Sequence, residues 1–365
     1  HCPRHTTIYR HLLQFLIFHG CRHLAWKGSL RQGAVLSICF TVNISPIIPN
    51  GKDHPFEKMT LDIAVVGHCP ALDFLSVTPV EVPTVYLAGD STMADYGAEY
   101  PYHPAACYGG WGQALDLYLD GSIAVCNHAH NGRSTETFRN EGHFDLIQKQ
   151  LRPGDFVVIQ FGHNDQKHPH LQAYNGYPEN LRRFIEEIRA KKALPILATP
   201  IARNTWTEQN GKLTYNDLLH DHAQACIALG KELNVPVLDL HQAAMEDIIR
   251  LGRDASKAYY HQGDWTHTND YGAVRAAGYA ANALRSLGGA FPDYLPLIQA
   301  VSVSIKPWKP EAALLLEKPV RLAGVKDPNG TEEGTAAQDH QAEKDGGDAL
   351  ARLLAAVQSA RGQGG

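Results

Sequence analysis

From residue 83 onward the sequence alternates short apolar runs with longer helix-like stretches, and this alternation limits the folds open to the chain. Regular βα alternation predicts a parallel sheet with helices on both faces, and ligands of such sheets bind at the carboxyl ends of the strands. We expect Thr214 to cap a helix. The predicted strands cover residues 83–88, 123–126, 155–161, 194–199 and 235–240, and the predicted helices cover 111–119, 134–151, 178–192, 214–233, 242–251 and 270–287.

The first predicted strand ends in Gly89-Asp90-Ser91-Thr92, which places Ser91 at a tight turn between a strand and a helix. Far downstream the chain carries Asp264-Trp265-Thr266-His267. A serine hydroxyl becomes a strong nucleophile when an imidazole removes its proton, and a carboxylate fixes the tautomer of that imidazole. Residues three apart lie on one side of a helical turn, so Asp264 and His267 could line up toward Ser91. The alternative for this pair is an ordinary surface contact, because the D-x-x-H spacing is common.

Two further segments place glycine and asparagine just after predicted strands. Asn127 to Ser134 follow the strand at 123–126, and Gly162 to Asp165 follow the strand at 155–161. An oxyanion needs two or three fixed donors. Glycine permits close approach of a backbone N–H, and asparagine offers a side-chain N–H. Gly132 and Asn164 fit these roles, and the alternative is an ordinary turn glycine and an Asx-turn asparagine.

The four segments occur in the order of the sequence blocks of the SGNH, or GDSL-type, hydrolases. The chain most resembles the rhamnogalacturonan acetylesterases, which are carbohydrate esterases with the patterns G-D-S-T, N-x-x-x-x-G-R-S, F-G-H-N-D and D-x-x-H-T. The resemblance covers residues 83–287. The serine elbow G-x-S-x-G of the α/β-hydrolases is absent from the chain. In this chain the four patterns correspond to Gly89 to Thr92, Asn127 to Ser134, Phe161 to Asp165 and Asp264 to Thr268.

The resemblance implies an α/β fold, a three-layer αβα sandwich of the flavodoxin-like kind around a parallel five-stranded sheet, preceded by a partial β-rich N-terminal region. It implies a carboxylic ester hydrolase in which Ser91 is the nucleophile, His267 the general base and then acid, and Asp264 the orienting carboxylate. It also implies three oxyanion donors: the Ser91 amide, the Gly132 amide and the Asn164 side chain. Nothing at these positions departs from the family's pattern.

Three classes of function are open to such a chain. The one we favour is a serine esterase that removes acetyl groups from acetylated pectic polysaccharide or oligosaccharide of the rhamnogalacturonan type, as part of pectin degradation. The second is an SGNH lipid esterase or thioesterase, which requires a larger apolar acyl pocket. The third is a catalytically silent binding module, against which the intact Ser91, Asp264 and His267 argue.

A pectic substrate requires hydrogen-bond donors and a cation for its galacturonate carboxylates. Arg133, Arg203 and His261 lie in or near predicted strand-end loops and are candidates for this contact, although each is equally consistent with a solvated loop residue. Two tryptophans, Trp206 and Trp265, could stack on sugar rings. Trp111 opens a predicted helix and is expected to pack in the core.

The composition limits the classes of partner that we expect for the chain. A net charge of −5 and a pI near 6.5 leave no basic field, so nucleic acid is not expected as a partner. We predict no metal and no cofactor, because the sequence has neither H-E-x-x-H nor a Cys/His cluster, and no membrane partner. The seven cysteines form no C-x-x-C pair, which favours a reduced, cytoplasmic location in a bacterial type of cell, with secretion left open. The oligomeric state is left open too.

The flanks divide the chain into a β-rich N-terminal region at 1–82, for which a truncated β-sandwich is one interpretation, a catalytic domain at 83–290 and a C-terminal extension at 291–365. Residues 60–66 and 71–82 alternate like two strands of a hairpin. Leu12 to Phe18 is too short for a signal-peptide core and is expected to be a strand or a helix. We expect a flexible linker at 327–347 and a short helix at 349–360.

Overall fold

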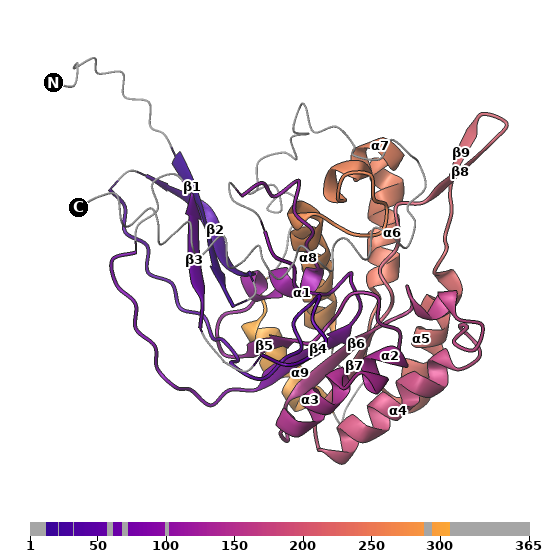
Figure 1. Cartoon of the computed structure of the whole chain (residues 1–365), viewed down its shortest axis with the longest axis horizontal. Helices are drawn as coiled ribbons and strands as arrows, with labels where there is room; N and C mark the ends of the chain where they lie inside the picture. Colours follow the sequence, from indigo (N-terminus) through magenta and orange to yellow (C-terminus); the bar gives the residue numbers. More distant parts are fainter. Residues whose placement is uncertain are drawn as a thin grey trace.

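The computed structural model describes residues 12–20, 22–31, 33–56, 61–67, 72–98, 102–287 and 294–306. Its central sheet has five parallel strands in the order β10-β7-β6-β4-β5 (Figure 1). All of them lie in the predicted apolar runs to within two residues, so the predicted parallel α/β fold is confirmed. The strands are β4 (Thr84–Gly89), β5 (Ala124–Asn127), β6 (Phe156–Gln160), β7 (Leu194–Ala198) and β10 (Val237–Leu238).

These strands are mostly apolar because both faces of the sheet are covered. Every residue of β4, β5 and β6 is buried. Successive residues of a strand point to opposite faces, and Val85 and Leu87 accordingly belong to one apolar cluster while Tyr86 and Ala88 belong to another. Cys126 packs in the second cluster.

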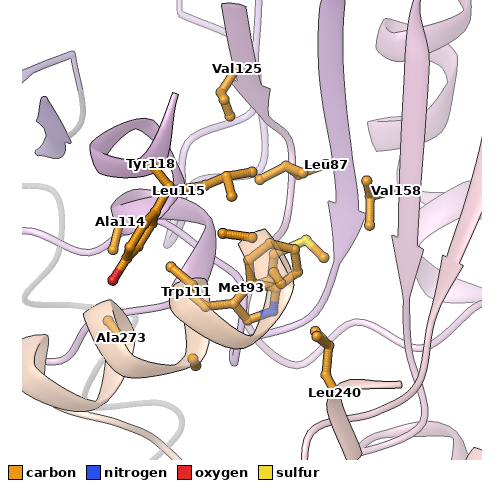
Figure 2. Close-up of a cluster of buried hydrophobic side chains, with 14 of the residues drawn as sticks. Leu87, Met93, Trp111, Ala114, Leu115, Tyr118, Val125, Val158, Leu240 and Ala273 are labelled. Carbon is orange, nitrogen blue, oxygen red and sulfur yellow. The ribbon is translucent and has the colours of Figure 1, made fainter. Parts of the chain in front are cut away.

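One helical layer covers each face of the sheet. Helices α3 (His143–Gln150), α4 (Tyr177–Ala190) and α5 (His220–Leu233) supply the cluster on one face. On the other face, Figure 2 shows Leu87 and Val158 from neighbouring strands around Trp111, with Ala273 of a helix beside it. That layer is built from α1 (Trp111–Ala114), the 3₁₀ helix η1 (Leu115–Tyr118), α6 (Leu240–Leu251), α8 (Asp270–Ser286) and α9 (Leu295–Ser304).

Two predicted helices differ from those in the structure. The helix predicted at 134–151 is divided into α2 (Thr137–Asn140) and α3 by Gly142, whose φ of 82° is incompatible with a continuing helix. The helix predicted at 214–233 begins only at His220, so the prediction that Thr214 caps it is wrong. The remaining short helices are η2 (Asp165–Lys167), α7 (Arg253–Ser256) and η3 (Lys257–Tyr259).

Thr214 lies instead in a β-hairpin formed by β8 (Trp206–Gln209) and β9 (Lys212–Tyr215). Its turn is Asn210-Gly211, with φ of 53° and 72°. Two consecutive positive φ values are required by the tight hairpin turn that Asn-Gly favours, so the local turn chemistry outweighs the helical pattern that continues downstream.

A second sheet, antiparallel and three-stranded, precedes the strands of the central sheet in the chain. Its order is β2-β1-β3, with β1 at Leu12–His19, β2 at His23–Arg31 and β3 at Ile63–Gly67. The expected strand or helix at Leu12 to Phe18 is therefore a strand, and the β-rich character of this region is confirmed. Figure 1 shows the sheet beside α1 and α8.

The predicted hairpin between 60–66 and 71–82 is wrong. Its first half corresponds to β3, but β3 pairs with β1, and among the described residues 72–82 there is no strand. The apolar side chains of this segment are exposed, among them Phe74 and Val77. A strand needs a neighbour for its backbone hydrogen bonds, and Pro79 also removes one donor.

The predictions for residues 327–347 and 349–360 fall outside the described residues. Within the described ranges, no helix has the length and apolar character that crossing a membrane requires.

Candidate active site

Ser91, His267 and Asp264 lie in series at the carboxyl edge of the central sheet. Ser91 directly follows β4, and His267 lies in the loop that leads into α8. His267 Nε2 is 2.9 Å from Ser91 Oγ, and His267 Nδ1 is 2.7 Å from Asp264 Oδ2. When Nδ1–H donates to Asp264, the lone pair of Nε2 points at the serine hydroxyl, which is the geometry a general base requires.

The D-x-x-H segment is itself a closed turn. Asp264 Oδ1 accepts the backbone N–H of Thr266 at 2.6 Å and that of His267 at 3.0 Å, while Oδ2 faces the imidazole. Burial alone would raise the pKa of Asp264, but its bonds to His267 and to the two amides lower it to about 2. The carboxylate is therefore ionised at any pH at which the protein is expected to work.

Gly89 and Asp90 shape the turn that presents Ser91. A Cβ at Gly89 would lie 3.0 Å from the Gln160 carbonyl oxygen of the next strand and 2.9 Å from the Met93 sulfur, so glycine fits there without displacing either atom. Asp90 Oδ1 accepts hydrogen bonds from Thr92 N at 2.9 Å and Thr92 Oγ1 at 2.8 Å, as in an Asx-turn. These bonds fix the residues on both sides of Ser91.

His163, which is not among the predicted site residues, lies behind this turn. Its Nε2 donates to the Ile201 carbonyl at 3.0 Å, and its Nδ1 is 3.1 Å from Asp90 Oδ2. A carbonyl only accepts, so Nε2 carries the proton of its contact with Ile201. Burial lowers the pKa of His163 below its usual value, although the nearby Asp90 carboxylate opposes this shift. Burial would raise the pKa of Asp90, but His163 and the Thr92 amide lower it. The Asp90–His163 pair therefore joins the residue before Ser91 to the residue before Asn164. The feature of the sequence that could have indicated His163 is its position between Gly162 and Asn164.

The two other candidate oxyanion donors are held in fixed conformations. Gly132 has a φ of 72°, a region that favours glycine. Asn164 Nδ2 donates to the Arg133 carbonyl at 3.1 Å, and its Oδ1 accepts Lys167 Nζ at 2.9 Å. An amide nitrogen carries two hydrogens and Arg133 engages one, which leaves the other for a substrate oxygen.

Hydrogen bonds join the loops that carry these donors. The Tyr96 hydroxyl lies 2.8 Å from the Ser91 carbonyl and 2.7 Å from Asn131 Oδ1, so the loops after β4 and β5 are linked. Asn164 joins the same group through its bond to Arg133. The candidate donors therefore lie on adjacent loops at one edge of the sheet, as its parallel topology predicts.

The two arginines considered for substrate contact lie beside these loops and are bonded within the protein. Arg133 Nε is 2.6 Å from Glu141 Oε2, and its Nη1 donates to the Asn131 carbonyl at 3.1 Å. Arg203 Nη2 donates to the His163 carbonyl at 3.4 Å. Arg133 thus helps to close its own loop, and contact of either arginine with a substrate stays a prediction.

His261, the third candidate, lies close to the base. Its ring stacks on Tyr108 with 3.7 Å between the ring centroids, and Tyr108 approaches His267 edge-on at 6.0 Å. Burial lowers the pKa of His261, which favours its neutral form. Of the tryptophans, Trp265 and Trp206 are half-buried and stay candidates for sugar contact, whereas Trp111 is fully buried, as predicted.

The sequence predicts no metal, and among the described residues one group of side chains could hold one, namely His19, His23 and Asp116. The His23 ring lies between two carboxylates, 3.0 Å from Asp116 and 3.0 Å from Asp95. Burial would lower the pKa of His23, but these carboxylates raise it to about 10. We interpret the group as a buried ion-pair network that holds β2 against η1. That the protein binds no metal stays a prediction.

The model of the GDSL-like Lipase/Acylhydrolase family matches residues 87–275, more than half of the chain. The chain belongs to this family. The matched range contains all four predicted sequence blocks, and the membership makes the chain a carboxylic ester hydrolase of the SGNH type.

Curated relatives of this GDSL hydrolase include named acetylesterases. The chain is 34% identical over 224 residues to the rhamnogalacturonan acetylesterase RhgT of Bacillus subtilis, an alignment that covers 58% of the chain and 93% of the relative. It is 31% identical over 251 residues to the rhamnogalacturonan acetylesterase of Emericella nidulans, covering 62% of the chain and 94% of the relative.

Among solved structures, protein YxiM of Bacillus subtilis matches this GDSL hydrolase with 26% identity and a TM-score of 0.50. The match covers 75% of the chain and 74% of YxiM. It extends beyond the family-model range, and it supports the SGNH fold of the catalytic domain.

Proposed function

We propose that this esterase removes acetyl groups from acetylated pectic polysaccharide or oligosaccharide of the rhamnogalacturonan type, through a Ser91-His267-Asp264 triad and an acyl-enzyme. The observation that carries the proposal is the hydrogen-bonded series of these three side chains. It occurs in a chain that aligns with more than nine-tenths of two relatives named for that activity.

In the first half of the proposed reaction, Ser91 Oγ attacks the carbonyl carbon of the acetyl group while His267 Nε2 takes the serine proton. The positive charge that forms on the imidazole lies against the ionised Asp264. His267 then gives the proton to the sugar oxygen as the bond between that oxygen and the acetyl carbon breaks. The sugar leaves with a free hydroxyl, and the acetyl group stays on Ser91.

In the second half, His267 takes a proton from water as the water oxygen attacks the acetyl carbon of the acyl-enzyme. Return of that proton to Ser91 Oγ releases acetate and restores the serine. In both halves the carbonyl oxygen gains negative charge, and the Ser91 amide, the Gly132 amide and Asn164 Nδ2 are the proposed donors to it. Because these donors lie on loops already fixed by hydrogen bonds, they need little rearrangement as the charge develops.

The proposed base predicts an acid-side loss of activity. Nε2 of His267 accepts the serine proton only when the imidazole is neutral, and histidines ordinarily lose their proton near pH 6.5. We expect kcat/KM to rise with pH through about 6 to 7 and then to level off. Asp264, with its pKa near 2, does not titrate in this range. A pH profile with 4-nitrophenyl acetate measures this, and a profile that is flat from pH 5 to 8 would contradict a histidine base.

The proposed substrate predicts a preference for short acyl groups. Each methylene for which a site has no room costs about 1–3 kcal/mol, so acetate esters are expected to exceed butyrate esters of the same alcohol by about 10-fold or more in kcat/KM. The same assay on acetylated rhamnogalacturonan oligosaccharide, with acetylated xylan oligosaccharide as the control, tests the sugar. Preference for butyrate or longer chains would favour the lipid esterase or thioesterase instead.

A further inference from the structure

One side chain of the N-terminal sheet reaches into the catalytic domain behind the candidate active site. Arg22 lies in the turn between β1 and β2, has a φ of 63° and is only 3% exposed. A left-handed backbone conformation is unfavourable for a residue other than glycine, and a buried guanidinium is costly without partners. This combination is stable only if the side chain is extensively bonded where it lies.

The partners of the Arg22 guanidinium all belong to the catalytic domain. Nε donates to the Tyr96 carbonyl at 3.0 Å, Nη2 donates to the Tyr108 carbonyl at 2.6 Å, and Nη1 donates to the Asp270 carboxylate. Tyr96 and Tyr108 lie outside helices and strands, and the Tyr96 carbonyl also accepts a hydrogen bond from Gln113 Nε2 at 2.9 Å. The planar guanidinium, with its donors in a rigid fork, can hold three such acceptors in one arrangement.

Each of these three partners lies near Ser91 or His267, either in space or in the sequence. The Tyr96 hydroxyl is 2.8 Å from the Ser91 carbonyl. The Tyr108 ring approaches His267 edge-on at 6.0 Å and stacks on Tyr96 at 5.6 Å. Asp270 follows His267 by three residues and is the first residue of α8. Arg22 thus joins the segments of the nucleophile and the base, which lie 176 residues apart in the sequence.

Apolar side chains pack around Arg22. Phe18 and Leu24 of the N-terminal strands belong to the same apolar cluster as Trp111 and Ala273 of the catalytic domain. The pocket left between the N-terminal strands and the helices α1 and α8 has a volume of about 20 Å³, room for about one water molecule. The hairpin is therefore packed against the catalytic domain, with little space for water beside the guanidinium.

We infer that Arg22 is a positioning residue of the esterase, which holds the Ser91 loop and the His267 loop in register, and that the β1–β2 hairpin is part of the catalytic unit. This inference rests on the proposed function in that it takes Ser91 and His267 as nucleophile and base. Arg22 itself touches neither the substrate nor the reacting atoms. It acts on the reaction through Tyr96, Tyr108 and Asp270.

Replacement of Arg22 should lower kcat and leave KM nearly unchanged. A displacement of about 1 Å between reacting groups can cost on the order of 100-fold in rate, so we expect Arg22→Gln to lose about 10- to 100-fold in kcat for 4-nitrophenyl acetate. KM should stay within about 3-fold, because no substrate contact is removed. Arg22→Lys keeps a cation beside Asp270 but lacks the fork, so it should recover only part of the loss.

The matched control is Leu24→Ala, which weakens the same interface without removing a bond to Tyr96, Tyr108 or Asp270. Thermal unfolding of each full-length variant gives its Tm, and kinetics are measured well below the lowest Tm. The rate of labelling of Ser91 by a fluorophosphonate reports its nucleophilicity without any sugar substrate. We expect labelling to slow in step with kcat in Arg22→Gln and to stay within about 3-fold of wild type in Leu24→Ala.

The outcomes separate the two proposals. The positioning role is overturned if Arg22→Gln and Arg22→Lys match the wild type in kcat and in labelling rate. It is also overturned if Leu24→Ala, with the same loss in Tm as Arg22→Gln, loses as much kcat as Arg22→Gln does. If Arg22→Gln does not fold, Arg22→Lys is compared with Leu24→Ala instead. The same criteria in kcat and labelling rate then apply at an equal loss in Tm. A wild type that hydrolyses 4-nitrophenyl acetate but not the pectic oligosaccharide overturns only the proposed substrate. A wild type that neither hydrolyses an ester nor is labelled overturns both.

Discussion

Replacing Ser91 with alanine is expected to lower kcat by about 10⁵-fold while the protein stays folded. The hydroxyl lies 2.9 Å from His267 Nε2, and removing it leaves no group in that position to form an acyl-enzyme. The residues of such a triad act as a unit, so loss of one costs about as much as loss of several, and a residual rate over water comes from the oxyanion donors. Steady-state kinetics on acetyl esters, with circular dichroism to verify the fold, measure the effect.

The double variant is the sharper form of this test. Ser91→Ala combined with His267→Ala should be no slower than Ser91→Ala alone, because the base has no function without the nucleophile. Ser286→Ala, an exposed serine near the end of α8, is the matched control and should keep wild-type activity. A folded Ser91→Ala protein that retained more than a few per cent of the wild-type kcat would remove Ser91 from the mechanism.

Replacing Asn164 with alanine is expected to lower kcat by about 10²- to 10³-fold with little change in KM. A donor that bonds the oxyanion more strongly than the ground-state carbonyl contributes about 3 to 4 kcal/mol to the transition state. The hydrogen bonds of this side chain are to the Arg133 carbonyl and to Lys167, and not to a residue of the triad. Its loss should therefore leave the triad in place. Kinetics on a small acetyl ester give both parameters.

Asn175→Ala supplies the control for this variant, because Asn175 is exposed and lies in the loop that precedes α4. It should behave like the wild type. If Asn164→Ala instead raised KM and left kcat unchanged, Asn164 would be a residue that binds the substrate, and the oxyanion hole would have to be assigned to other donors.

The parallel sheet could be predicted because its strands are apolar on both faces. The run before Gly89 and the run before Gly162 read as strands without reference to any partner, since burial on two sides removes the polar alternation. The common position of Ser91 and the candidate oxyanion donor Asn164 follows from the same topology. Ser91 lies two residues after β4 and Asn164 four residues after the neighbouring β6, and parallel strands bring such residues to one edge.

Elements that depend on a distant partner could not be predicted in this way. Residues 72–82 alternate as a strand would, but β3, their predicted partner, pairs with β1 instead, and among these residues there is no strand. The β8–β9 turn differs from these residues because its signal is local. Asn210-Gly211 tolerates the two positive φ values that a tight hairpin requires, and this turn interrupts the helical pattern predicted for 214–233.

The supports of the site are also distant in sequence. Asp90 meets His163 across 73 residues, and Arg22 meets Asp270 across 248 residues. Nothing in the spacing of these residues distinguishes them from surface charges. Only the packing shows that each is buried and bonded to a segment that carries a proposed catalytic group.

The most direct test of the Ser91 mechanism is the mass of the protein after reaction with a fluorophosphonate, followed by identification of the modified peptide. A nucleophilic Ser91 predicts a single adduct on that residue, loss of esterase activity in proportion to the adduct, and no adduct in Ser91→Ala. Complete inactivation with Ser91 unmodified, or an adduct on another residue that accounts for the lost activity, would contradict the mechanism.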